Sequence, residues 1–334
     1  MAGLKALQQP DPIVKAANRQ TFQAQIDGLI ALYNQGKLKQ ALEAGEALEK
    51  QFPNTPYIPN LLGVVNTGLG RLEQAVAGFE KALAIKPDYA AAYNNMGGAL
   101  MDKAEPDAAI ESFKMALKIK PDYANPKHLI AALTGSTTAT APRVYVESLF
   151  DNYAFRFDTS LVQKLNYKIP EALAQIILTN KTGSSLGPIL DLGCGTGLAG
   201  VARQKNIYDR LIHIDLIEYL SSADLDFDYF VSTDVFVYIG ELSDVFHLIK
   251  SRNKRAGRLA FSTEHTEKEG YFLETSGRYS HSKAYIEELC EKFEYKISHF
   301  STTKLRKEKK SYLTGGLYLL DFAPKPYPDH GRDY

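Results

Sequence analysis

A short stretch of the chain places a carboxylate directly before three closely spaced glycines. Asp191 is followed by Gly193, Cys194, Gly195 and Gly197, and the apolar run GPIL precedes them. Glycine permits a tight turn and lets a ligand approach backbone N–H groups at the start of a helix. Cys194 has no neighbour that would activate a thiolate, so it is interpreted as a small loop residue. The spacing predicts a ligand-binding loop between a strand and a helix.

A second carboxylate follows at a distance that has chemical meaning. Asp215 lies near the end of the apolar run RLIHIDL (210–216), 22 residues after Gly193. In nucleotide-binding α/β domains an acid about 20 residues past the glycine loop accepts hydrogen bonds from ribose hydroxyls. By spacing alone, Asp215 is the candidate for that role.

Further candidates follow other predicted elements. Asp234 ends the run FDYFVSTDV, where a residue at the carboxyl end of a strand faces a ligand, or else caps the next helix. Tyr153 and Phe157, in FDNYAFRFD, present aromatic faces that suit a cationic ligand, or else pack within a helix.

A polar cluster comes later in the chain, in FSTEH and SGRYSHS. It offers Glu264, His265, Arg278, Tyr279 and His281. A histidine can act as general base on a hydroxyl or carboxyl acceptor, and an arginine can hold a carboxylate through two hydrogen bonds. We expect His265 and His281 as catalytic candidates and the other three as substrate contacts, against the alternative of ordinary polar surface.

The elements that must position these residues alternate in type. Short apolar runs (PILDLG, RLIHIDL, FDYFVSTDV, RLAFSTE) are separated by helical patterns such as YIGELSDVFHLIKSRN. This alternation predicts a parallel sheet covered by helices. The last part, residues 294–322, predicts two antiparallel strands joined by the basic turn KLRKEKK, which is interpreted as solvated.

The first third of the chain repeats itself every 34 residues. Three sets of residues follow this period. They are Pro53, Pro87 and Pro121; Gly36, Gly70 and Ala104; and Ala41, Ala75 and Ala109. Each unit predicts two amphipathic helices with a turn at the glycine or alanine and a stop at the proline. One helix pair cannot bury its apolar face alone, so neighbouring pairs must stack.

This pattern resembles the tetratricopeptide repeat (TPR), with about three copies over residues 21–123 and a capping helix over 124–135. The resemblance implies an α-solenoid whose groove holds a protein or peptide partner. A stabilising or dimerisation module is the alternative.

The phrase LDLGCGTG resembles motif I of class I S-adenosylmethionine-dependent methyltransferases. Residues 145–173 and 261–289 are similar to segments of predicted methyltransferases that carry N-terminal tetratricopeptide repeats. The resemblance implies a Rossmann-like sheet with a C-terminal antiparallel hairpin, and S-adenosylmethionine as cofactor. It implies cofactor contacts from Tyr153, Asp191, Gly193, Cys194, Gly195, Gly197, Asp215 and Asp234.

Compared with that family, about one βα unit is missing after Gly200. Only 12 residues lie between Asp215 and Asp228, which belongs to the run that resembles the fourth strand of the family. By likeness, RLIHIDL is the third-strand region and Asp215 an adenine-side acid. A shortened crossover would nevertheless lay this run beside the first strand and bring Asp215 to the ribose.

Composition narrows the function classes. The chain has 39 basic and 39 acidic residues, so no general attraction to nucleic acid or to an anionic membrane is expected. No run approaches the roughly 18 apolar residues of a membrane span, and no secretory signal pattern opens the sequence. Cys194 and Cys290 lie far apart, so neither a disulfide framework nor a metal site is expected. We expect a cytoplasmic protein.

The expected organisation is a tail (1–20), TPR repeats (21–135), a linker (136–143), a methyltransferase-like domain (144–324) and a second tail (325–334). The expected function is methyl transfer to an O or N acceptor, guided by the repeats. The alternative is a TPR interaction or scaffold protein whose shortened methyltransferase domain is catalytically impaired.

Overall fold

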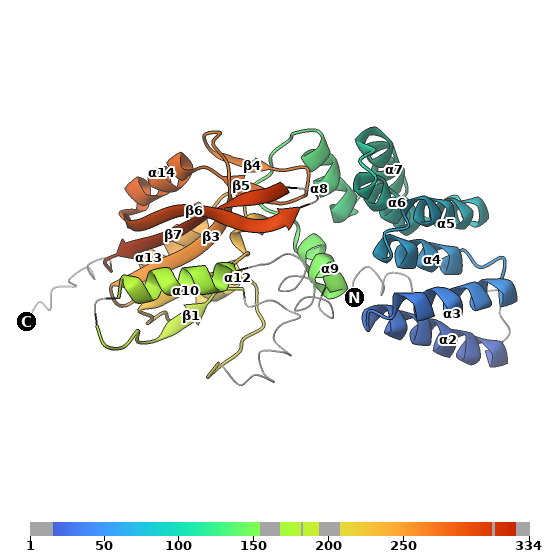
Figure 1. Cartoon of the computed structure of the whole chain (residues 1–334), viewed down its shortest axis with the longest axis horizontal. Coiled ribbons are helices and arrows are strands. Elements are labelled where there is room, and N and C mark those ends of the chain that lie inside the picture. The colour runs from blue at the N-terminus through green and yellow to red at the C-terminus, as the bar shows by residue number, and fades with distance from the viewer. Residues whose placement is uncertain (1–15, 154–167, 182, 194–207, 309–310, 325–334) are drawn as a thin grey trace, which may run out of the picture. The chain divides into compact units, whose positions relative to one another are not determined.

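The computed structural model describes residues 16–153, 168–181, 183–193, 208–308 and 311–324. The chain divides into two compact units (Figure 1). The helical unit comprises Met1–Ser136 and Pro142–Arg156, and the sheet unit comprises Thr137–Ala141 and Phe157–Tyr334. Each unit has its own core and is described by itself.

The helical unit consists, in its described part, of α-helices that pack against their neighbours in chain order. These are α2 (Ala16–Asn34), α3 (Leu38–Gln51), α4 (Tyr57–Gly68), α5 (Leu72–Ile85), α6 (Ala90–Asp102), α7 (Pro106–Ile119), α8 (Ala124–Leu133) and α9 (Arg143–Tyr153).

The turns within the repeats lie where the sequence predicts them. Gly36, Gly70 and Ala104 all adopt a left-handed backbone, with φ of 73°, 73° and 61°. In each turn the next residue donates its N–H to the carbonyl five positions earlier, at 2.9 Å, which satisfies a carbonyl left over at the end of a helix. The second helix of each pair ends two residues before Pro53, Pro87 or Pro121.

The 34-residue period is also a packing period. A Cβ atom added to Gly63 would lie 2.5 Å from the Phe79 ring, and one added to Gly97 would lie 2.5 Å from the Phe113 ring. Each phenylalanine is fully buried against the helix that carries the glycine. The small residues thus let the two helices of a pair approach closely.

The sheet unit contains a mixed sheet (Figure 1). Its strands are β1 (Ile189–Asp191), β2 (Tyr229–Ser232), β3 (Gly257–His265), β4 (Tyr271–Leu273), β5 (Tyr279–His281), β6 (Lys296–Glu308) and β7 (Ser311–Phe322). Its helices are α10 (Ile169–Thr179), α12 (Leu216–Ser222), the 3₁₀ turn η2 (Phe236–Tyr238), α13 (Ser243–Arg252) and α14 (Lys283–Phe293).

The parallel strands run in the order β1-β2-β3, and β7 pairs antiparallel with the other edge of β3. The C-terminal strands β6 and β7 form the expected antiparallel hairpin. Beyond the end of β2, the short strand β5 pairs with the last residues of β3, and β4 pairs with β5. The hairpin β4–β5 therefore lies past the carboxyl end of β2.

Alternation along the strands produces two cores. Phe230 and Phe261 pack with Phe246 and other side chains of α13 and α14 on one face. Ala260 packs with Leu173 of α10 on the opposite face. Period-two alternation in a sheet covered on both sides accounts for the nearly continuous apolar runs of the sequence.

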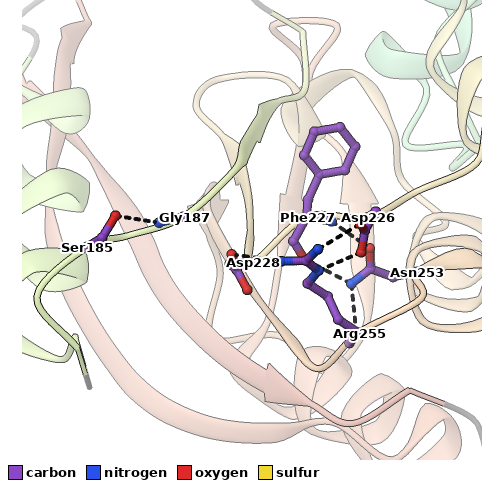
Figure 2. Close-up of polar contacts among 7 residues, drawn as sticks. All are labelled: Ser185, Gly187, Asp226, Phe227, Asp228, Asn253 and Arg255. Atoms are coloured by element: carbon purple, nitrogen blue, oxygen red, sulfur yellow. Dashed lines mark hydrogen bonds and ion pairs between the residues drawn. The ribbon is translucent and has the colours of Figure 1, made fainter.

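Figure 2 shows a network of hydrogen bonds and ion pairs at the amino ends of the parallel strands. Arg255 donates from Nε and Nη2 to the two carboxylate oxygens of Asp226, at 2.5 and 2.6 Å, and from Nη1 to Asp228 at 3.4 Å. The side chain of Asn253 accepts from the N–H of Phe227 at 3.0 Å and donates to its carbonyl at 2.9 Å. These bonds fix the chain that enters β2.

Two sequence expectations are wrong. The run at 210–216 is not a strand: residues 210–215 are irregular, α12 begins at Leu216, and the side chains of Ile212 and Ile214 are exposed. Leu216, the last residue of this run, is the first residue of α12, so a strand could not continue through it. The basic run is mostly strand, because β6 continues to Glu308.

Candidate functional site

The carboxyl ends of β1 and β2 carry the first two candidate carboxylates. Asp191 is the last residue of β1 and is half-buried; Tyr208 donates a hydrogen bond to its Oδ2. Burial raises the pKa of Asp191, and the hydrogen bond from Tyr208 opposes this. Gly193, two residues on, has φ of 81°, and a Cβ atom there would lie 2.4 Å from Cγ2 of Val235. The turn after β1 therefore requires glycine, and it lies against the chain that leaves β2.

Asp234 adopts an unusual backbone just past β2. Its φ is 57°, and its N–H donates to Oγ of the buried Ser262 on β3 at 3.1 Å. A left-handed non-glycine residue is uncommon, and aspartate tolerates it better than most. Tight turns at adjacent strand ends form the edge where ligands bind in parallel α/β sheets.

The later candidates reach the same edge through β3 and β5. Glu264, which is buried, pairs in register with Ser280, and His265 pairs with His281. Tyr279 is the first residue of β5, and Arg278 comes directly before it. The other four residues of the predicted polar cluster thus lie within strands. The structure thus brings together the segments that the sequence left apart.

Arg278 is held by protein groups. Its Nε donates to the Tyr238 hydroxyl at 3.3 Å, and its guanidinium carbon lies 5.9 Å from the centre of that ring. Burial acts to lower the pKa of Arg278, but the charges of Tyr238, Asp234 and Glu264 raise it above its ordinary value. The guanidinium is therefore permanently charged and oriented beside Asp234 and Glu264.

His281 holds the loop after η2. Its Nε2 lies 2.9 Å from the carbonyl oxygen of Ile239 and 3.0 Å from that of Gly240, and its side chain is fully buried. Burial lowers the pKa of His281 to about 4, although the two carbonyls act in the opposite direction. The ring is neutral at pH 7, with Nε2 committed to the backbone.

His265 differs from His281. Its side chain is 6% exposed, and its Nε2 lies 3.3 Å from Oε1 of Glu267. Its Nδ1 is buried and has no hydrogen-bond partner among the described residues, as is also true of Nδ1 of His281. The ring centre of Phe300 on β6 lies 5.8 Å away.

The side chain of Tyr279 also bonds to another group of the protein. Its side chain is fully buried, and its hydroxyl lies 2.5 Å from Oγ1 of Thr138. Burial raises the pKa of Tyr279, which keeps the phenol protonated.

Asp215 is the N-cap of α12. Its Oδ1 accepts from the N–H groups of Ile217 and Glu218, at 2.9 and 3.2 Å, and the residue is exposed. A cap of this kind typically contributes about 1 kcal/mol to helix stability. The carboxylate has a structural task that spacing alone did not indicate.

Other predicted contacts lie outside the described residues. Cys194, Gly195, Gly197 and Phe157 belong to this group. Tyr153 ends α9, and its side chain is not described.

Three residues near the site were missed by the sequence analysis. Tyr238 orients Arg278, Ser262 accepts from the backbone at Asp234, and Thr138 contacts Tyr279. Tyr238 stands in a run already assigned to helix, and Ser262 within an apolar strand. Thr138 lies in a segment without apolar periodicity, so no sequence signal distinguished it.

Some site classes find no support in the described part of the chain. No three histidine, cysteine or acidic side chains there are grouped as metal ligands would be. Among the described helices, none combines the length and apolar character needed to cross a bilayer. The described Cys290 is a buried free thiol, and burial raises its pKa to about 12, so it is unreactive at neutral pH.

Comparison with known families identifies the helical unit. The family described as TPR repeat matches residues 67–103, and the family described as tetratricopeptide repeat matches residues 90–123. The N-terminal region therefore contains TPR repeats, as predicted. No curated protein matches the chain.

Several solved structures are similar to about a third of the chain. The first TPR of Spaghetti (RPAP3) bound to an HSP90 peptide is 17% identical, covers 34% of this chain and 91% of its own, and has a TM-score of 0.33. The second TPR domain of human RPAP3 in complex with an HSP70 peptide is 15% identical, with coverages of 35% and 97% and a TM-score of 0.33. The Yersinia enterocolitica chaperone SycD in complex with a YopD peptide is 15% identical, with coverages of 37% and 92% and a TM-score of 0.31. These scores add no argument to the repeat assignment, and the sheet unit is a mixed-sheet domain of unidentified family.

Proposed function

We propose that the sheet unit binds S-adenosylmethionine at the carboxyl ends of β1 and β2 and transfers a methyl group to an O or N acceptor. The helical unit would hold a protein or peptide partner, and the protein would act in the cytoplasm. The observation that carries the proposal is the close approach of Gly193, two residues after Asp191, to Val235, the residue that follows Asp234 past β2.

The described residues fit the cofactor in two respects and depart from it in one. A half-buried carboxylate ends β1, and a glycine in a left-handed turn follows it, as the likeness to motif I requires. Asp215, the expected ribose ligand, has one carboxylate oxygen committed to capping α12. Hydrogen bonds to a charged acceptor contribute about 1.5–3 kcal/mol each. Loss of the two hydrogen bonds expected from the ribose hydroxyls to Asp215 would therefore weaken cofactor binding strongly.

When bound, S-adenosylmethionine supplies an electrophilic methyl group on a sulfonium and leaves as a neutral thioether. The protein groups would contribute mainly by positioning the acceptor against the methyl group. Arg278, fixed by Tyr238, would orient Asp234 and Glu264 at the strand ends. Of the two histidines, we assign the base to His265, because His281 is fully buried and its Nε2 is bonded to backbone carbonyls, whereas the His265 side chain is 6% exposed.

Calorimetric titration of the full chain with S-adenosylhomocysteine tests the proposal. We expect a micromolar Kd and a loss of at least about tenfold in Asp191→Asn. Asp226→Asn is the matched control, because this carboxylate lies at the amino end of the sheet and pairs with Arg255. Equal affinity in Asp191→Asn and the control would contradict the placement of the site.

The second candidate is an interaction or scaffold protein whose shortened sheet unit has lost the cofactor. The capping role of Asp215 favours it. Absence of S-adenosylhomocysteine binding at millimolar concentration, in a folded protein, would select this second candidate.

A further inference from the structure

Five residues of the sheet unit come from the stretch expected to be a linker. Thr137–Ala141 belong to the sheet unit, although the chain before and after them, up to Ser136 and from Pro142, belongs to the helical unit. We refer to Thr137–Ala141 as the crossing strand.

Backbone hydrogen bonds fix the crossing strand to the loop that follows η2. The carbonyl of Ala139 accepts from the N–H groups of Gly240 and Glu241, at 2.9 and 2.8 Å. The N–H of Ala141 donates to the carbonyl of Tyr238 at 3.0 Å, and Thr140 forms an antiparallel bridge with Ile239. The backbone of this segment is therefore bonded to the sheet unit through an isolated β-bridge and its flanking hydrogen bonds, although residues 137–140 are exposed.

Side chains extend this contact to the hairpin β4–β5. The Thr138 hydroxyl lies 2.5 Å from the Tyr279 hydroxyl, and Oγ1 of Thr137 accepts from the N–H of Leu273 at 3.4 Å. The crossing strand thus joins the two elements that surround the candidate site. One carries Tyr238, which orients Arg278, and the other carries His281.

Two helices of the helical unit flank the crossing strand in the sequence. Helix α8 ends at Leu133 and α9 begins at Arg143, and the rings of His128 and Tyr145 meet with their centres 4.6 Å apart. Both side chains are buried. Holding the two ends of a short loop together lowers the entropy that its residues lose on docking.

We propose that the crossing strand is a conformational link: the packing of α8 on α9 sets how firmly residues 238–241 are held beside Arg278. A ligand of the repeats that tightens or loosens the α8–α9 pair then changes ligand affinity at the sheet edge. Because such coupling is reciprocal, a ligand at the sheet edge also changes the affinity of the repeats for their partner.

Hydrogen exchange of the full chain, without any ligand, tests the link. The reporters are the amides of Gly240 and Glu241, which are both bonded to Ala139. We expect Tyr145→Ala to speed their exchange at least about tenfold, and Tyr145→Phe, which keeps the ring on His128, to retain most of the protection. Thr138→Val, which removes the hydroxyl that meets Tyr279, should speed it as well, and it serves if Tyr145→Ala does not fold.

Tyr89→Ala is the control, since this half-buried tyrosine belongs to the same unit but lies outside the α8–α9 pair. Unchanged exchange in Tyr145→Ala, or equal acceleration in Tyr89→Ala, would overturn the proposal. If S-adenosylhomocysteine binds, its Kd should rise in Tyr145→Ala and not in Tyr89→Ala. If it does not bind, the proposed function fails while the exchange data still decide on the link.

Discussion

Ala104 stands in a backbone conformation that its side chain disfavours. Its φ is 61°, and the equivalent turns of the two preceding units have glycine at Gly36 and Gly70. A left-handed conformation costs an L-residue about 1–2 kcal/mol, and the residue is exposed, so its methyl group contributes little packing.

We therefore expect Ala104→Gly to stabilise the helical unit by about 0.5–1 kcal/mol, after allowing for the greater freedom of glycine in the unfolded chain. Thermal unfolding followed by circular dichroism measures the change. A lower Tm in the variant would contradict the strain assigned to this turn.

His281 makes the stability of the sheet unit depend on pH. Its pKa is about 4 in the folded chain, against 6.5 when unfolded, so between these values the unfolded chain binds more protons. The stabilisation is complete above pH 6.5 and is lost as the pH falls toward 4.

Between pH 7 and 4.5 this histidine should cost about 2–3 kcal/mol of stability. His281→Gln lacks the titrating group, and we expect a smaller loss over the same interval. Urea unfolding at both pH values compares the two proteins. Parallel losses would show that His281 does not titrate differently on folding.

At the scale of elements, glycines decide how closely segments approach. Adjacent glycines of α6 differ completely: Gly97 faces the Phe113 ring at 2.5 Å from an added Cβ, whereas Gly98 faces open space. We expect Gly97→Ala to destabilise the helical unit by about 1–3 kcal/mol. Gly98→Ala should stabilise it by up to about 1 kcal/mol, because alanine favours a helix. Chemical denaturation of the two variants gives the signs directly, and equal signs would refute the packing account.

The turn into β1 offers a second case. An added Cβ at Gly187 would lie 1.9 Å from Oδ2 of Asp228, which also contacts Arg255. Gly270 shares a positive φ but has nothing within 4 Å of an added Cβ. Gly187→Ala should therefore destabilise the sheet unit clearly more than Gly270→Ala does, by about 1–3 kcal/mol in a urea titration. A difference near zero would mean that Asp228 moves aside freely.

The sequence predicts elements well where the signal is local. Turns at Gly36, Gly70 and Ala104 follow from a 34-residue period, and the C-terminal hairpin follows from two β-rich runs. The run at 210–216 has strand composition, yet pairing requires a neighbouring strand edge, which is a property of the whole sheet. The site divides in the same way. Residues at the ends of recognised strands could be predicted, while partners such as Tyr238 depend on how distant segments meet.

At the scale of the molecule, two units with separate cores should lose protection separately. In hydrogen exchange under mild denaturant, we expect Gly97→Ala to weaken protection in α6 and α7 and to leave β3 unchanged. Gly187→Ala should do the reverse. If both variants weakened both units equally, the chain would unfold as one cooperative body.

The crossing strand also has a consequence for synthesis on the ribosome. Thr138 and Tyr279, which meet through their hydroxyls, are 141 residues apart in the chain. Contacts of such sequence separation form late. Translation adds about 5–20 residues per second, so the helical unit can finish folding many seconds before residues 238–281 emerge. During that interval the backbone groups of Thr137–Ala141 lack their native partners, and the nascent chain presents unpaired backbone N–H and C=O groups that a chaperone can bind.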